Sequence, residues 1–211
     1  MALSHSPRII TDGLVLCLDA GNTKSYPGSG TTWTDLIGSN DGTLTNGPTF
    51  DSANGGSIVT DGSNDFIQTS AQMFNPNSNF SVSFFVKRTG DGSLISNTSS
   101  GSFQIQLSGA LSIVDSFVVN LFTFSNVAVI NTWYNLCLVR SGNTYTLYRN
   151  NSVFGSFSSS NSFTRGPNVL GKNGSNSEFF DGHYGIVTCY NRALTAAEVA
   201  QNYNALKGRY Q

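Results

Sequence analysis

The sequence predicts an all-β fold, a two-sheet antiparallel jelly-roll sandwich with one short C-terminal helix. About a dozen short segments read as strands, several alternating apolar and polar residues, and clusters of Gly, Ser or Asn separate them. Helical spacing occurs in one segment only, near the C-terminus. The composition agrees, because 22 glycines, 12% aromatic and only 11% charged residues are typical of a turn-rich chain with a buried core.

Strands are predicted wherever apolar alternation or a short apolar run lies between turn residues. The predicted strands are residues 13–19, 57–60, 66–69, 80–87, 103–107, 111–114, 117–122, 134–140, 145–149, 152–154, 169–170 and 185–190. Ser141-Gly142-Asn143-Thr144 and Asn150-Asn151 are typical hairpin turns. The polar stretch 22–49 is interpreted as rim loops with short strands.

The segment 80–87 shows the alternation most clearly. One face carries Phe80, Val82, Phe84 and Val86, and the other carries Ser81, Ser83 and Lys87. This pattern predicts a half-buried strand.

A helix of about 12 residues is predicted after Thr195, because Thr195 and Glu198 have the spacing of a capping box. Val199, Tyr203 and Leu206 follow at helical spacing, and Gly208 is expected to end the last turn.

The length predicts one domain, residues 13–211, preceded by an N-terminal arm, residues 1–12. A net charge of -1 without a basic stripe argues against nucleic acid. No apolar run reaches the roughly 20 residues of a membrane span, and the N-terminus lacks the pattern of a secretion signal. Cys17, Cys137 and Cys189 are odd in number and lie in apolar runs, which predicts buried, reduced thiols.

Four blocks of sequence carry a resemblance to a known family. They are residues 180–199, with Tyr190-Asn191-Arg192-Ala193-Leu194 at their centre, and residues 13–22, 60–66 and 132–135. Together they resemble laminin G-like domains of the concanavalin A-like lectin/glucanase superfamily, over roughly 13–208. The opening at Gly13, residues 25–33 and residues 203–210 are also similar to a subset found in tailed-phage and other virion structural proteins. The resemblance implies a jelly roll whose helix packs beside the first and last strands.

Asp61, Asn64 and Asp65 form a candidate metal site, because hard cations bind clustered oxygen ligands. The resemblance supports Ca²⁺ at the rim, since relatives often hold it there. The alternative is that these side chains only cap their own turn. Where many relatives carry Ile-Asp, this chain has Tyr184-Gly185, which weakens the metal prediction. No cofactor is predicted to be required.

The early loop offers a second candidate site, for sugar. Lectin sites combine an aromatic platform with amide or carboxylate groups. The candidate ligand-binding residues are Asn22, Tyr26, Trp33, Asp35 and Asn40. The alternative is that Trp33 is a plug beneath its own loop, and Trp133 is predicted to be core.

Catalysis is not predicted. A glucanase needs two carboxylates about 5 to 10 Å apart, and the chain has only two glutamates, Glu178 and Glu198, the second of which belongs to the capping box. A nucleophilic mechanism would depend on His183, since His5 lies in the arm. The protein is therefore expected not to be an enzyme.

Three functional hypotheses follow, of which the third is a degenerate glycan-active enzyme. The first is a non-enzymatic virion structural protein, a capsid decoration or cement protein or a tail or fibre component, on the virion surface. Its expected partners are other virion proteins, further copies of the chain and host cell-surface polysaccharide. The alternative is a free, extracellular lectin-like module that binds carbohydrate, with or without Ca²⁺. Fold alone does not decide between them.

Overall fold

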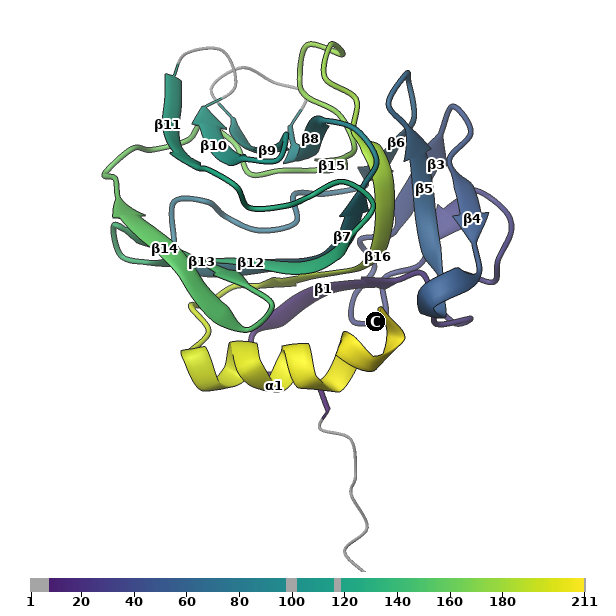
Figure 1. The fold of residues 1–211 in the computed structure, drawn as a ribbon, viewed down its shortest axis with the longest axis horizontal. Helices are drawn as coiled ribbons and strands as arrows, with labels where there is room; N and C mark the ends of the chain where they lie inside the picture. Colours follow the sequence, from purple (N-terminus) through teal and green to yellow (C-terminus); the bar gives the residue numbers. More distant parts are fainter. Residues whose placement is uncertain (1–7, 98–101, 116–118, 211) are drawn as a thin grey trace, which may run out of the picture.

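The computed structural model describes residues 8–97, 102–115 and 119–210. Two antiparallel sheets pack face to face, and a single α-helix covers the outer face of one of them (Figure 1). The predicted fold class is confirmed. Among the described residues, no helix has the length and apolar character that a membrane span requires.

Most strands are short, as the turn-rich sequence requires. They are β1 (Leu14–Asp19), β2 (Thr32–Trp33), β3 (Gly42–Thr45), β4 (Thr49–Asp51), β5 (Ser57–Asp61), β6 (Phe66–Thr69), β7 (Phe80–Arg88), β8 (Gly92–Ser96), β9 (Phe103–Leu107), β10 (Leu111–Asp115), β11 (Val119–Phe124), β12 (Trp133–Ser141), β13 (Thr144–Arg149), β14 (Ser152–Ser158), β15 (Val169–Leu170) and β16 (Asp181–Tyr190). The helices are α1 (Ala196–Leu206) and two 3₁₀ turns, η1 (Ala53–Gly55) and η2 (Lys207–Arg209).

The first sheet has the order β14-β13-β12-β7-β16-β5-β4, and β1 also pairs with β16. The long strand β16 makes this arrangement possible, because its first half pairs with β5 and its second half with β1, while β7 lies along its other side. The second sheet has the order β11-β10-β9-β8-β15-β6-β3-β2.

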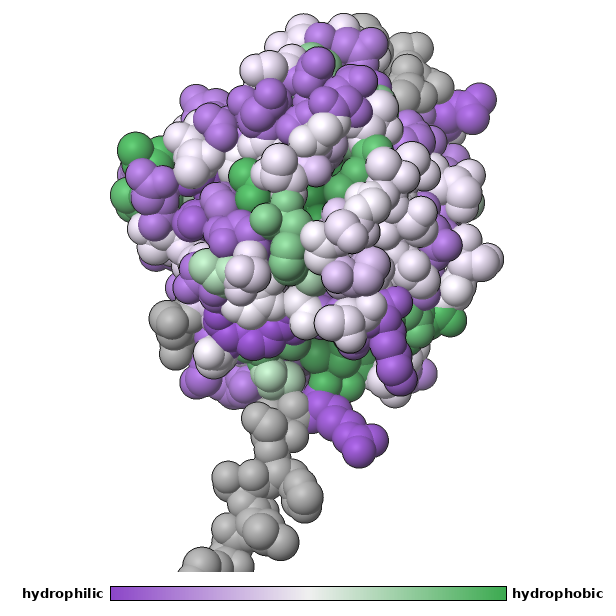
Figure 2. Space-filling model, turned by 90° about the vertical axis from the view of Figure 1, so that its right-hand side faces the viewer, coloured by the Kyte–Doolittle hydropathy of each residue, from purple (hydrophilic) through white to green (hydrophobic). Residues whose placement is uncertain are grey.

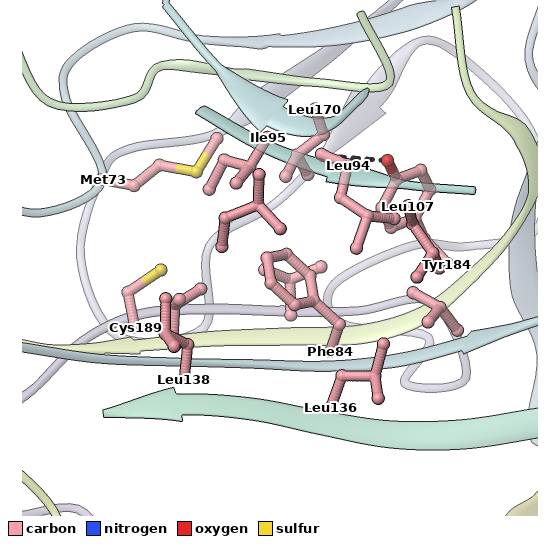
Figure 3. Packing of buried hydrophobic residues seen from close by; sticks show 14 of the residues in the cluster. Met73, Phe84, Leu94, Ile95, Leu107, Leu136, Leu138, Leu170, Tyr184 and Cys189 are labelled. Atoms are coloured by element: carbon pink, nitrogen blue, oxygen red, sulfur yellow. Dashed lines mark hydrogen bonds between the residues drawn. The ribbon is translucent and has the colours of Figure 1, made fainter. Parts of the chain in front are cut away.

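The main core fills the space between the sheets. Phe84 and Leu138 of the first sheet point toward Ile95 and Leu107 of the second (Figure 3). Tyr184 is also fully buried here, and its hydroxyl donates to the carbonyl of Leu94 at 2.8 Å, which ties the two sheets together (Figure 3).

A second apolar layer lies between the first sheet and α1. Val199 of the helix packs in a buried cluster with Phe85 and Ile186 of the sheet. The half-buried prediction for residues 80–87 is wrong for this reason: Ser81 is 0% exposed although it faces away from the main core. Its hydroxyl donates to the carbonyl of Arg192 and accepts from the amide of Leu194, so the covered polar face is satisfied.

The predicted capping box is confirmed. The Thr195 hydroxyl accepts from the Glu198 amide, and the Glu198 carboxylate accepts from the Thr195 amide. Arg192 adds an ion pair to Glu198 at 2.7 Å. Gly208 does not end α1, because the chain continues directly into η2.

The predicted arm, residues 1–12, lies partly outside the described residues. Its last residues contact the same chain: the amide of Ile10 donates to Asn202 of α1, and the carbonyl of Ile10 accepts from the Tyr190 hydroxyl. The boundary between arm and domain stays a prediction.

Strand predictions failed where an irregularity in the strand pairing interrupts the alternation of apolar and polar residues. The strand β8 was not predicted, because a register shift places Leu94 and Ile95, consecutive residues, both in the core. The described part of the strand predicted at 117–122 is β11, which continues to Phe124, and Phe117 lies outside the described residues. On the side of the molecule that carries β3, β4 and β5, hydrophobic surface shows only in small patches (Figure 2).

Candidate functional site

A pocket of about 390 Å³ opens at one end of the sandwich, where four turns meet. It is lined by Gly62 of the β5–β6 turn, residues 91–92 at the start of β8, Gln106 and Ser108 at the end of β9, and residues 177–179 of the β15–β16 loop. We call it the rim pocket. It is built from segments that are far apart in the sequence.

Local sequence explains how these turns come together. The Asp61 carboxylate accepts from the amides of Ser63 and Asn64, which closes the β5–β6 turn, and Gly62 has a φ of 72°. Gly92 has a φ of 150°, and a Cβ there would collide with the carbonyl oxygen of Phe179. Glycine at position 92 therefore lets the β15–β16 loop approach β8.

Glu178 is held in place by two amides of β9. The Gln104 side chain donates to Glu178 Oε2 at 3.1 Å, and the Gln106 side chain donates to the same oxygen. Both glutamines face away from the core because Phe103, Ile105 and Leu107 alternate with them. The carboxylate is thus oriented at the wall of the pocket instead of moving freely.

A second carboxylate, Asp91, lines the same pocket and pairs with Arg88 Nη1 at 2.7 Å. The Nε of Arg88 donates to the carbonyl of Ala128 at 3.1 Å. Beyond Arg88 lies a second hollow of about 520 Å³, which shares Ser108 with the rim pocket and includes the β11–β12 loop. We call it the apolar shelf, since Val129 and Ile130 on it are 63% and 48% exposed.

The rim pocket therefore combines groups that suit a ligand rich in hydroxyls. Glu178 and Gln106 offer charged and amide hydrogen-bonding groups, and Ser108 and Ser177 add exposed hydroxyls. Phe179, a partly exposed residue of the lining, adds an aromatic side chain. A few polar groups beside an aromatic ring are typical of small-molecule sites.

The structure buries both aromatic residues of the candidate sugar site in the early loop. Trp33 is 0% exposed and packs in the main core, so its ring offers no surface to a sugar. This burial agrees with the alternative that Trp33 fills the space beneath its own loop. Tyr26 is 4% exposed; its ring packs 5.4 Å from that of Phe50, and its hydroxyl donates to the carbonyl of Gly30. Tyr26 nevertheless borders a shallow hollow of about 180 Å³.

The polar residues of this candidate sugar site form hydrogen bonds to the backbone of the surrounding loops. Asp35 is buried and accepts from the amides of Cys17, Ile37 and Gly38. The Asn40 side chain bonds the segment 70–72, and the Asn22 side chain accepts from the amide of Lys24. Ligand binding at this loop stays a prediction.

The candidate metal ligands lie beside the rim pocket, in the β5–β6 turn. Burial and the nearby Asp61 charge raise the pKa of Asp65, while backbone hydrogen bonds, first that of Ser63, lower the pKa of Asp61. Asn64 is exposed. Within residues 8–97, 102–115 and 119–210, no three His, Cys, Asp or Glu side chains form a group that could hold a metal ion. Asp61 already uses one oxygen to close the turn, so the residues fit the turn-capping alternative better than a Ca²⁺ shell.

Comparison with known proteins agrees with this architecture. A family model described as the concanavalin A-like lectin/glucanases superfamily matches residues 61–200, which include β6 to β16 and the rim pocket. The chain belongs to this superfamily. No curated protein matches the chain by sequence.

Several solved structures share the superfamily fold with this chain. Domain 4 of AbnA, a GH43 extracellular arabinanase from Geobacillus stearothermophilus in complex with arabinotriose, has a TM-score of 0.70 at 18% identity, covering 94% of this chain and 98% of that chain. The binding domain of Paraclostridial Mosquitocidal Protein 1 has 0.65 at 20%, covering 92% and 52%. A mutant of Trypanosoma rangeli sialidase displaying trans-sialidase activity has 0.65 at 14%, covering 94% of this chain. This chain spans only 34% of the length of that sialidase chain.

These comparisons correct the expectation that the protein is not an enzyme. The similar structures include a sialidase chain and an arabinanase domain, so this superfamily fold is one that occurs in glycosidases. The argument from sequence also counted only glutamates, whereas the rim pocket places Glu178 together with Asp91.

The predicted similarity to tailed-phage virion proteins is not part of the family match, and it stays a prediction.

The residues of the rim pocket were missed although one signal was present. The alternation of residues 103–107 already placed Gln104 and Gln106 on the outer face of a strand. Glu178 was counted only as one of two glutamates, because nothing in the sequence shows that the β15–β16 loop lies against β9.

Proposed function

We propose that the protein binds carbohydrate through the rim pocket. The observation that carries the proposal is the Glu178 carboxylate, fixed by the amides of Gln104 and Gln106 beside the partly exposed ring of Phe179. Membership of the superfamily supports it, and the arabinotriose in the similar arabinanase domain shows that a domain of this fold holds a sugar.

Each part of the pocket has a role in binding. Sugar hydroxyls donate to the Glu178 carboxylate, and such charge-assisted hydrogen bonds contribute about 1.5 to 3 kcal/mol each. Because two amides already orient the carboxylate, little side-chain entropy is lost when the sugar binds. The apolar face of the sugar ring packs against Phe179, while Ser108 and Ser177 exchange hydrogen bonds with further hydroxyls.

Glycan arrays followed by calorimetry with the best ligand test this proposal. The wild type should give saturable binding, and Phe179→Ala and Gln106→Ala should each weaken it about tenfold or more. Gln201→Ala is the matched control, because Gln201 lies on α1 and its side chain donates to the carbonyl of Arg8. Its affinity should equal that of the wild type.

A variant of the early loop separates the two candidate sites. Asn22→Ala should leave binding unchanged. Loss of binding in Asn22→Ala, with full binding in Phe179→Ala and Gln106→Ala, would move the site to the loop predicted from the sequence.

The virion structural role and its partners stay a prediction to be tested separately. Cryo-electron microscopy of native particles should show the chain at a repeated position with residues 1–11 against a neighbouring subunit. Particles that lack the chain would overturn the virion surface as its location and leave the extracellular lectin-like alternative.

A further inference from the structure

We propose that the rim pocket selects neutral saccharides and rejects saccharides that carry a carboxylate. This inference rests on the proposed function, because it names the class of sugar that the same site accepts. The selectivity is inferred from the charges around the pocket and not from the sialidases among the similar structures.

The wall of the pocket is negative. Glu178 and Asp91 are its charged lining residues, and none of the described residues that line it is Lys, Arg or His. A carboxylated sugar seated between Gln106 and Phe179 would bring its charge beside that of Glu178. A neutral sugar can donate hydroxyl hydrogens to the same oxygens.

Two more carboxylates stand behind the wall. Asp61 and Asp181 are paired in register where β5 meets β16. A Cβ at Gly62, a lining residue, would lie 2.8 Å from the Cβ of Asp181, so this carboxylate is next to the wall. The Asp181 side chain accepts a hydrogen bond from the Thr89 hydroxyl.

The cations in this region are already engaged. Arg88 uses Nη1 for Asp91 and Nε for the carbonyl of Ala128. Lys172, in the β15–β16 loop, has its Nζ 3.6 Å from the ring centroid of Phe66 and 2.9 Å from Asn176 Oδ1. A ligand carboxylate, whose recognition normally uses such groups, would therefore have to compete with Asp91 for Arg88 and with Asn176 and the Phe66 ring for Lys172.

The neighbouring apolar shelf also favours neutral sugars over carboxylated ones. It shares Ser108 with the rim pocket, and its other exposed residues, which are Ser125, Asn126, Val129 and Ile130, are uncharged. A second sugar unit reaching the shelf would meet no cation there except Arg88, which is paired with Asp91.

Matched pairs of oligosaccharides that differ only in oxidation at C6 test the selectivity. The probes are galactotriose with trigalacturonate, and cellotriose with its triuronate, measured by calorimetry with and without Ca²⁺. The wild type should bind the neutral member of at least one pair about tenfold more tightly, because the uronate carboxylates would be repelled by Glu178 and Asp91. The preference should shrink as salt screens the charges.

Two substitutions that keep side-chain shape should change the preference. Glu178→Gln with Asp91→Asn removes both charges and releases Nη1 of Arg88 from its ion pair. The uronate should then bind within about threefold of the neutral sugar. Asp12→Asn, which removes a carboxylate paired with Arg192 and outside the pocket lining, is the control and should keep the wild-type preference.

The outcomes separate the two proposals. Equal or tighter binding of the uronate by the wild type, with or without Ca²⁺, would overturn the selectivity and leave carbohydrate binding intact. A preference that the double variant retains would also overturn it. If no saccharide binds the wild type, in the array or in these pairs, both proposals fail.

Discussion

The ring of Tyr210 lies directly over Gly185. A Cβ built on Gly185 would come within 2.6 Å of the Tyr210 hydroxyl, and the ring also stacks on Phe85 at 4.6 Å. Tyr210, the residue that follows η2, thus covers the outer face of β16 at Gly185, where a side chain would block it. This contact explains why Tyr184 is followed by glycine.

We predict that Gly185→Ala destabilises the fold by about 2 kcal/mol, because a methyl group in a filled space forces neighbours off their positions. Urea unfolding measures the change. In a Tyr210→Ala background the same substitution should cost less, since the clash is gone and the two sites are coupled. The control is Gly208→Ala, where a Cβ meets nothing within 4 Å; its stability should stay within about 0.5 kcal/mol of the wild type. Equal losses in both backgrounds would contradict this explanation.

Acid should weaken the start of α1 through Glu198. The Arg192 guanidinium, followed by the Thr195 amide, lowers the pKa of Glu198 from 4.5 to about 2. A carboxyl whose pKa is lower in the folded state contributes stability that is full above pH 4.5 and is lost as the pH falls toward about 2. Glu198→Gln should therefore cost about 1 kcal/mol at pH 7 and flatten the loss of stability between those pH values.

Urea unfolding from pH 7 to pH 2 measures this effect. Thr195→Ser keeps the capping hydroxyl and should preserve the acid dependence of the wild type. If the unfolding free energy of Glu198→Gln falls with pH as steeply as that of the wild type, other carboxyl groups cause the acid dependence.

Much of the fold could be predicted from short-range patterns. The capping box at Thr195 is a local signal, and it was confirmed together with the alternation that marks β7, β9 and β13. The burial of Ser81 could not be predicted, because it depends on α1 packing over β7 across more than a hundred residues of sequence. The alternation predicted the strand correctly, but the polar face that it assigned to solvent is buried.

The site was harder to predict because it is made by loops. The contact between Glu178 and Gln106 joins residues 72 positions apart, and no local spacing encodes it. Trp33 shows the opposite failure, since an aromatic residue in a polar loop resembles a sugar platform although its ring is fully buried. Burial and pairing across sheets, which the sequence does not display, decide both cases.

His183 should make stability fall at mildly acidic pH. Burial, and then the positive charge of Lys87, lower the pKa of His183 from 6.5, while Asp51 and Asp181 act in the opposite direction. Its Nδ1 lies 3.0 Å from the hydroxyl of Ser57. Because the unfolded chain binds the proton more readily, stability is full above about pH 6.5 and is lost as the pH falls below that value.

Chemical unfolding between pH 7.5 and pH 5 measures this dependence. We expect His183→Gln to flatten the curve, with a difference below about 1 kcal/mol since the ring is partly exposed. Lys87→Gln should weaken the dependence, because it removes a charge that opposes protonation. A steeper curve in Lys87→Gln would contradict the assignment.

The three thiols should be inert in the folded protein. Cys17, Cys137 and Cys189 are free and buried, and burial raises the pKa of Cys17 and of Cys137 to about 12 and that of Cys189 above its ordinary value. The thiolate is the reactive form, so at pH 8 a thiol reagent such as DTNB should find almost none in the native state and three groups after unfolding. Val153→Cys, at a position that is 60% exposed, should react at once and serves as the control. Reaction of the native wild type as fast as that of this variant would show that the strands open readily around these residues.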